Sequence, residues 1–297
     1  MKKKILLFGM ILSILAFTSC SKDSEPATTE TSVTSNDVGA NQDMDDVIDD
    51  VSLIADDQYE AKEGSTTGKT IGDYYSIKPE CAIVSDLGST AEVRKLTITF
   101  GTATSACLFR GHSLKGKIIL TRTTGTTFPK YMTVTFDGFY VNDRKLEGTS
   151  TWKREMLGSA TAVPSTLHPK TTFTMTEMKL TTTAGVYIRN GDRIREMTAG
   201  FSTRTSPTDD VYSTYGTFTT THPNGSVFTS LIEAATPLVH KAVCSLSQPP
   251  LPFPVSGMLK LTKNTHSATI DYGTGACDNL ATLSIDGGTA TEIHLGH

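Results

Sequence analysis

The chain has 297 residues and a formal net charge of −4, from 27 Lys and Arg and 31 Asp and Glu. The charge is uneven, because residues 21–63 hold 13 acidic and two basic side chains, whereas residues 64–297 hold 18 acidic and 22 basic ones. The basic excess is spread along the chain and forms no Lys/Arg block. This distribution argues against nucleic acid as a partner.

Residues 1–19 are predicted to be a lipoprotein signal peptide. Three lysines at positions 2–4 precede an apolar run over residues 5–17. This run is shorter than the roughly 20 residues that a helix needs to cross a bilayer, which is typical of a secretory signal. The run leads into Thr-Ser-Cys20, where we expect cleavage before Cys20 and lipid on its thiol. An ordinary secretory signal with a cysteine near the cut is the alternative.

Residues 20–41 are predicted to be a lipidated, disordered tether, because they are rich in Ser, Thr, Glu and Ala and poor in apolar side chains. Residues 21–25, Ser-Lys-Asp-Ser-Glu, resemble the Lys-plus-acidic export signal of surface-exposed lipoproteins in the Bacteroidota. The resemblance implies an outer-membrane lipoprotein displayed at the cell surface, with the membrane as a partner through the lipid. A location facing the periplasm is the alternative.

Residues 42–63 are predicted to form an acidic amphipathic helix. Apolar side chains recur at i, i+3, i+4 and i+7, which places them in one stripe, and aspartates cover the remaining faces. Asn41 or Asp43 is suited to cap the first turn. We expect the helix to pack on the rim or face of a sheet. An EF-hand calcium site is not favoured, because its glycine turn and ligand order are missing. The stripe consists of Met44, Val47, Ile48, Val51, Ile54 and Ala55.

Residues 64–297 are predicted to form one all-β domain. Segments such as 96–100 and 132–136 alternate apolar and polar side chains, and threonine is abundant, as on the exposed face of strands. Residues 140–149 and 187–195 each have the pattern of a strand, a tight turn and a second strand. We therefore expect an antiparallel meander of a dozen or more strands, arranged as a sandwich or a curled sheet, with one short N-terminal helix.

Four cysteines besides Cys20 indicate two disulfides in an oxidising compartment. Residues 97–107 resemble residues 269–277, since both read Thr-Ile-x-aromatic-Gly-Thr and then Ala-Cys, and each has another cysteine upstream. We expect two related units, near 74–120 and 237–295, on either side of a central meander over 121–235. Four cysteines permit three pairings, of which this repeat favours Cys81–Cys107 and Cys244–Cys277.

Several segments resemble an uncharacterised family of flavobacterial-type surface or outer-membrane lipoproteins of the Bacteroidota. They are the ending Asp-Tyr-Gly-Thr-Gly-Ala-Cys-Asp-Asn-Leu-Ala-Thr-Leu at 271–283, Gly-Lys-Ile-Ile at 116–119 and the hairpin at 141–149. The resemblance covers most of the chain beyond Tyr74. It implies an envelope location and a β architecture, and it implies no activity.

Motifs of catalysis are missing from the sequence. There is no G-x-S-x-G or H-E-x-x-H, and the seven histidines are scattered singly. Residues 64–70 are one residue short of a phosphate loop, which favours a linker. Asp271, Asp278 and Asn279 could coordinate calcium, although a turn stabilised by their side chains is favoured. Trp152 and the tyrosines could stack on a sugar, although core packing or cross-strand pairing is favoured for most of the tyrosines in or beside strands.

The sequence therefore predicts a membrane-anchored, non-catalytic binding, adhesion or scaffold module of the cell surface. A glycan or a protein is the expected kind of ligand, and we expect no cofactor. Two alternatives remain open. One is a carrier or chaperone for lipid or another hydrophobic ligand, which a curved sheet with an apolar concave face would suit. The other is a hydrolase, which requires a histidine and an acid from distant loops to meet in a cleft.

Overall fold

A computed structural model describes residues 32–66, 76–101, 105–125, 127–162, 165–203, 206–247 and 250–296. The predicted signal peptide, the predicted lipidation site Cys20 and residues 21–31 of the predicted tether lie outside the described residues. Residues 32–297 form one compact unit. No helix in the described segments is long and apolar enough to cross a membrane.

The described residues contain one long helix and fifteen strands of a single antiparallel sheet, which confirms the predicted all-β meander. The sheet order is β1-β2-β4-β5-β6-β7-β8-β9-β10-β12-β13-β14-β15, with β3 beside β4 and β11 beside β9 and β12. The elements are α1 (Ser35–Thr66), β1 (Ile83–Ser85), β2 (Val93–Phe100), β3 (Cys107–Phe109), β4 (His112–Thr123), β5 (Lys130–Val141), β6 (Arg144–Leu157), β7 (His168–Thr182), β8 (Gly185–Ala199), η2 (Pro207–Asp209), β9 (Val211–Thr221), β10 (Val227–Ile232), β11 (Leu238–Lys241), α2 (Ala242–Ser245), β12 (Ser256–Lys263), β13 (His266–Thr274), β14 (Leu280–Ile285) and β15 (Thr291–His294).

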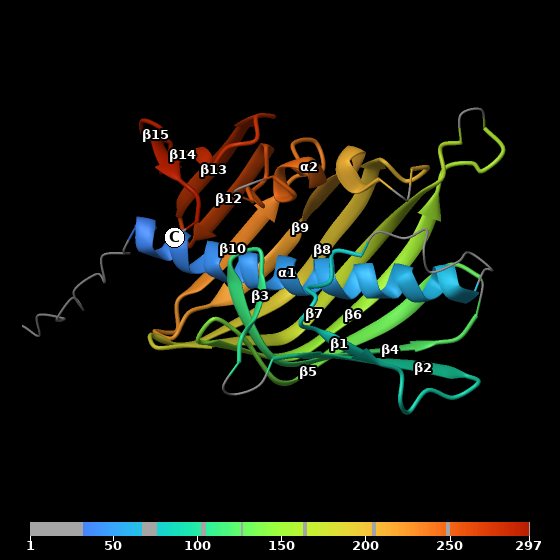
Figure 1. Ribbon diagram of the computed structural model, residues 1–297. Coiled ribbons are helices and arrows are strands. Elements are labelled where there is room, and N and C mark those ends of the chain that lie inside the picture. Colours follow the sequence, from blue (N-terminus) through green and yellow to red (C-terminus); the bar gives the residue numbers. More distant parts are fainter. Residues whose placement is uncertain are drawn as a thin grey trace, which may run out of the picture. The chain divides into compact units, whose positions relative to one another are not determined.

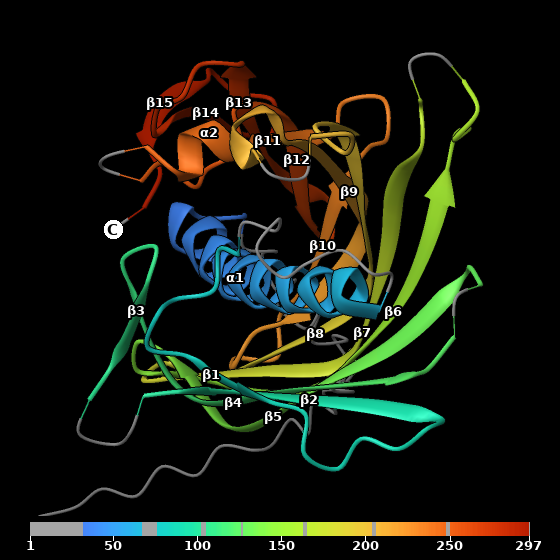
Figure 2. The ribbon, with the colours of Figure 1, turned by 45° about the vertical axis from the view of Figure 1, so that its right-hand side comes forward.

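The sheet curls around α1, which lies along its concave face (Figures 1 and 2). Burial along strands such as β7 alternates, because successive side chains of a strand point to opposite faces. The inward side chains and the apolar stripe of α1 form one hydrophobic core. All six stripe residues are buried, and Met44 and Ile54 are fully so. The predicted packing of the helix on a sheet face is therefore confirmed.

The helix begins at Ser35, seven residues before the predicted start, so residues 35–41 are helical and not part of a disordered tether. Its N-terminus is a capping box: Asp37 N–H donates to Thr34 Oγ1 at 3.2 Å, and Thr34 N–H donates to Asp37 Oδ2 at 2.9 Å. Val33 and Val38 flank this box and are both buried, in the positions of a hydrophobic staple. Thr34 therefore caps the helix, in place of the predicted Asn41 or Asp43.

One predicted hairpin is present and the other is wrong. Residues 142–143 do separate β5 from β6, but residues 187–195 all lie within β8. The glycine signal there has another cause. Gly191 has φ of +131°, and a Cβ atom on it would lie 2.6 Å from Phe218 Cα in the neighbouring strand. Glycine at this position thus allows close approach of β8 and β9, and β8 continues without a turn.

Both expected disulfides are present. Cys81 pairs with Cys107 and Cys244 with Cys277, with Cα–Cα distances of 5.5 and 5.4 Å. The first bridge ties β3 to the segment before β1, and the second ties α2 to the loop after β13. The two disulfide-containing regions lie at opposite ends of the strand order.

Candidate ligand-binding site

Strand β8 carries three arginines on the face that meets α1. Arg189, Arg193 and Arg195 are separated by even numbers of residues, so their side chains leave the strand on the same side. Arg189 is fully buried, and the side chains of Arg193 and Arg195 are 5% and 10% exposed. Three cations in the interior need partners, because an unpaired charge away from water is very costly.

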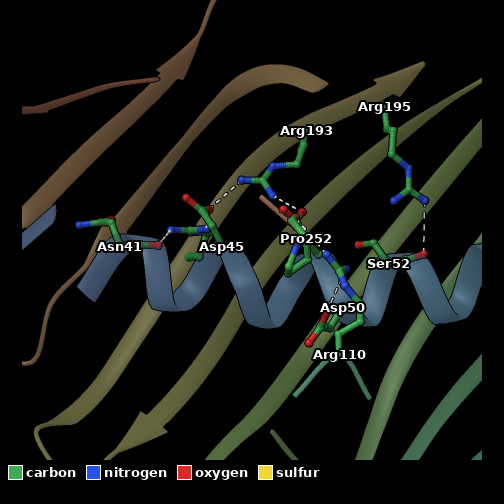
Figure 3. A network of polar contacts seen from close by, with 10 residues as sticks. Asn41, Asp45, Asp50, Ser52, Arg110, Arg193, Arg195 and Pro252 are labelled. Carbon is green, nitrogen blue, oxygen red and sulfur yellow. Dashed lines mark hydrogen bonds and ion pairs between the residues drawn. The ribbon is translucent and has the colours of Figure 1, made fainter. Parts of the chain in front are cut away.

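Aspartates of α1 supply these partners (Figure 3). Asp45 Oδ1 accepts from Arg189 Nη1 and, at 2.7 Å, from Arg193 Nη2. Arg193 Nη1 donates to Asp49 Oδ1 at 2.6 Å. Arg193 thus bridges two carboxylates one helical turn apart. Because both guanidinium groups are held by charged acceptors, the middle of α1 is fixed against β8.

The row of ion pairs continues toward the C-terminal part of α1. Arg195 Nη2 donates to Asp56 Oδ2 at 2.7 Å and to the Ser52 carbonyl oxygen at 3.4 Å. Arg154, from β6, donates to Asp56 Oδ1 at 2.5 Å and also to Glu60. Burial acts to raise the pKa of Asp56, but the two arginines outweigh it, so its pKa is lowered. Asp56 is therefore ionised at neutral pH.

A further set of contacts involves Asp50, whose side chain is 4% exposed. Arg110 Nη1 donates to Asp50 Oδ1 at 3.2 Å, and Arg110 Nη2 donates to the Pro252 carbonyl oxygen at 3.0 Å. His112 Nδ1 also forms a hydrogen bond with Asp50, and this bond raises the pKa of His112. Many of the aspartates that the sequence assigned to the remaining helix faces therefore pair with the body of the sheet. The uneven charge of the chain therefore largely reflects ion pairs between its acidic helix and its basic sheet.

A cavity of about 540 Å³ lies beside α1, between the helix and the part of the sheet that contains β9 and β11. Cavities of about 300–1,000 Å³ are typical of small-molecule sites. Apolar walls are supplied by Leu53, Ile77, Phe109, Pro207, Leu246 and Pro252. Ionisable side chains in the walls are Asp49, Lys78, Glu80, Arg110, Arg195, Asp210, Tyr212, His240 and Lys241. We name this cavity the helix pocket.

A second cavity, of about 110 Å³, adjoins the helix pocket. The two share six lining residues, among them Arg195 and Tyr212, so these two side chains lie where the cavities meet. The Arg195 guanidinium carbon is 5.5 Å from the centroid of the Tyr212 ring. The Ile77 N–H donates to Asp57 Oδ1 at 3.0 Å, which fixes the segment around Ile77, at the edge of both cavities, to α1.

His240 is the histidine of the helix pocket. Burial lowers its pKa to about 4, with Arg110, Arg193 and Arg195 adding to the effect and Asp49 opposing it. The imidazole is thus neutral at neutral pH. Burial acts to raise the pKa of Asp49, but Arg193, His240 and Arg195 outweigh it, so the pKa is lowered and this carboxylate is charged.

The polar cluster that the sequence offered for calcium does not line the helix pocket. Asp271 Oδ1 accepts from Gly273 N–H at 2.9 Å, Asp278 Oδ1 accepts from Leu280 N–H at 3.1 Å, and Asn279 Nδ2 donates to the Leu295 carbonyl oxygen. The bonds of Asp271 and Asp278 are the local bonds of Asx turns, whereas Asn279 bonds to a residue 16 positions further along the chain. Within the described segments no group of three or more His, Cys, Asp or Glu side chains is arranged to hold a metal ion.

Trp152 is a core residue. It is 3% exposed, its ring packs edge-to-face on Phe173 at 4.5 Å between centroids, and its Nε1 donates to Ser150 Oγ at 3.0 Å. Its ring is therefore not available to stack on a sugar. Tyr212 is the tyrosine that lines the helix pocket, and the sequence reasoning did not select it.

The sequence reasoning also missed the arginines of β8, Arg110 and His240. One signal was available: Arg189, Arg193 and Arg195 lie at even spacing in one strand, on the same face as Tyr187 and Met197. Because amphipathic strands normally keep charges outside, such a row indicates buried partners elsewhere in the chain.

No protein-family model, no curated protein and no solved structure gives a significant match to this chain.

Proposed function

We propose that this protein is a membrane-anchored, non-catalytic binding protein whose helix pocket holds a small ligand. The observation that carries the proposal is the cavity itself. Its volume of about 540 Å³ is that of a small-molecule site, and its walls combine apolar side chains with a few charged ones. A glycan or protein ligand at the cell surface remains compatible with this proposal, if part of that ligand enters the pocket.

The walls of the pocket are held in place before a ligand arrives, which favours binding. Arg195 is fixed by Asp56 and Ser52, and Asp49 is fixed by Arg193. Side chains that are already ordered lose little conformational entropy when a ligand binds. A pocket of this kind supports affinity and orientation without any movement of α1.

The proposed location is the outer membrane, with the folded unit at the cell surface. The sequence supports it through the predicted signal peptide and the cysteine at position 20. Two or three acyl chains on Cys20 would anchor the protein durably, because each buried methylene contributes about 0.8 kcal/mol. The two disulfides are in keeping with an oxidising compartment. Membership of the lipoprotein family that the sequence resembles is also part of this proposal.

One observation bears on catalysis. His240 and Asp49 both line the helix pocket, so a histidine and an acid share one cleft, which is part of what a hydrolase would require. However, a pKa of about 4 makes His240 a weak base at neutral pH, and general bases work best with a pKa near the working pH. We therefore propose binding as the function, with hydrolysis as the second candidate.

The carrier alternative is restricted by the position of α1. Buried side chains such as Met44 and Ile54 fill the space along the concave face. A hydrophobic ligand would therefore enter the helix pocket, and not spread over the apolar face of the sheet.

Blocking the pocket tests the proposal. Ser245 lines it, whereas Val243 in the same short helix is 45% exposed and does not. Native mass spectrometry of the chain, after incubation with a small-molecule extract of its source cells, should show a bound mass. Ser245→Trp should abolish the adduct and Val243→Trp should retain it. An adduct that persists in Ser245→Trp, or no adduct in any variant, would contradict the proposal.

A further inference from the structure

Several side chains that line the helix pocket have hydrogen-bond donors that no described residue accepts from. Every hydrogen bond that Arg195 makes to described residues comes from Nη2, so its Nε and Nη1 groups keep their protons available. Arg110 Nε is buried and has no partner among the described residues. A buried donor without a partner is unfavourable, and an acceptor that reached it would relieve this.

His240 and Lys241 add further donors. The imidazole of His240 makes no hydrogen bond to the described part of the chain, and as a neutral ring it offers one N–H group. Lys241 Nζ donates to the Gly275 carbonyl oxygen at 2.7 Å. This leaves two of its three protons, and its charge has no carboxylate partner among the described residues. A ligand in the pocket would therefore present acceptor oxygens to these groups.

The acids of the pocket limit how much negative charge it tolerates. Asp49, Glu80 and Asp210 line the same cavity, and Asp49 is charged. Asp50 and Asp56 already balance much of the charge of Arg110 and Arg195. A doubly charged group such as a phosphate monoester would face these carboxylates with an uncompensated charge. A single negative charge, spread over two oxygens, suits the donors and meets weaker repulsion from these carboxylates.

The remaining walls suit an apolar tail. Leu53, Ile77, Phe109 and Leu246 line the same cavity as Arg195. Figure 2 shows the region between α1 and the β9–β11 part of the sheet where the pocket lies. From these observations we infer that the helix pocket binds a singly charged anion with an apolar tail, of the fatty-acid type, with its carboxylate held by Arg195 and His240. This inference rests on the proposed function and specifies its ligand class.

The inference is tested with linear saturated carboxylates and the alcohols of equal length, by titration calorimetry on the full chain. Decanoate should bind at least tenfold more tightly than decanol. Between hexanoate and decanoate, each added methylene should tighten binding about fourfold, which corresponds to about 0.8 kcal/mol per buried methylene. A short-chain anionic phospholipid is included. If it binds more tightly than decanoate, the anion is a lipid headgroup and the anion site is supported.

Two arginine variants locate the anion. Arg195→Gln should weaken decanoate at least tenfold and leave decanol unchanged. Arg144→Gln is the matched control, because Arg144 also pairs with α1, through Asp43 at 2.9 Å, but does not line the pocket. It should leave both ligands unchanged. If Arg195→Gln does not fold, His240→Leu takes its place with the same expectation, since the imidazole of His240 forms no hydrogen bond to a described residue.

The outcomes separate this inference from the proposed function. Equal affinity for decanol and decanoate overturns the anion site, even if the pocket binds both. No binding of either, together with an adduct that Ser245→Trp abolishes, also overturns the inference and leaves the proposed function standing. No binding and no adduct would contradict both.

Discussion

Loss of the Asp45 charge should destabilise the fold far more than loss of a neighbouring charge on the same helix. Asp45 Oδ1 accepts from both Arg189 and Arg193, and the three side chains are 13%, 0% and 5% exposed. Asp45→Asn keeps the shape but leaves two buried guanidinium groups short of one negative charge. Removing one partner of a buried ion pair costs about 3–5 kcal/mol, and we expect this loss in the free energy of unfolding.

Asp43→Asn is the control. Its pair with Arg144 is about 28–29% exposed on both sides, and such pairs contribute about 0–1 kcal/mol. Urea unfolding followed by the fluorescence of Trp152, the single and buried tryptophan, measures both variants. Asp45→Asn should move the midpoint down by about 1–2 M. A loss below about 1 kcal/mol, no larger than that of Asp43→Asn, would refute the view that these ion pairs are buried and coupled to folding.

Three further variants test other parts of the structure. Cys244→Ser opens a bridge that spans 33 residues and should cost about 3–4 kcal/mol in urea unfolding, while peptide mapping of the unreduced chain should join Cys244 to Cys277. Asp46→Asn probes a carboxyl whose pKa burial and neighbouring aspartates raise to about 7. The folded state therefore keeps this proton up to about pH 7, whereas the unfolded chain releases it near pH 4, so stability falls as the pH rises between these values. The variant should gain nothing near pH 4 and become more stable than the parent through pH 7; a gain independent of pH would contradict the assignment. Gly191→Ala should cost about 1–3 kcal/mol, because a Cβ atom would meet Phe218 and φ is positive; a neutral effect would contradict the close strand approach.

Local patterns predicted the fold class well. Alternating apolar and polar side chains predicted the strands, and an apolar stripe predicted α1. Both signals depend only on neighbours in sequence. The start of α1 was within reach of the same reasoning. Thr34, with Asp37 three residues later and valines on either side, is a capping box with a staple. Residues 39–43 contain no large apolar side chain, which hid this signal and favoured a tether.

The candidate site could not be predicted from local sequence patterns. Arg193 and its partner Asp49 are 144 residues apart, and nothing near either residue identifies the other. The charge imbalance between residues 21–63 and the rest of the chain was visible, yet it also fits an exposed acidic segment. The structure distinguishes an exposed acidic segment from a paired one. The curvature of the sheet brings β6, β8 and the turn after β3 to the same helix. Gly191 shows the same limit, because a turn signal and a close strand contact both use glycine.

The helix pocket and its proposed ligand depend on one claim: that α1 is an integral part of the core, held by buried ion pairs. Native-state hydrogen–deuterium exchange of the full chain tests it most directly. If the claim holds, backbone amides of residues 44–55 exchange as slowly as those in the centre of β7 and β8, and Asp45→Asn speeds up the exchange of α1. Rapid exchange of residues 44–55 while β7 and β8 stay protected would contradict it.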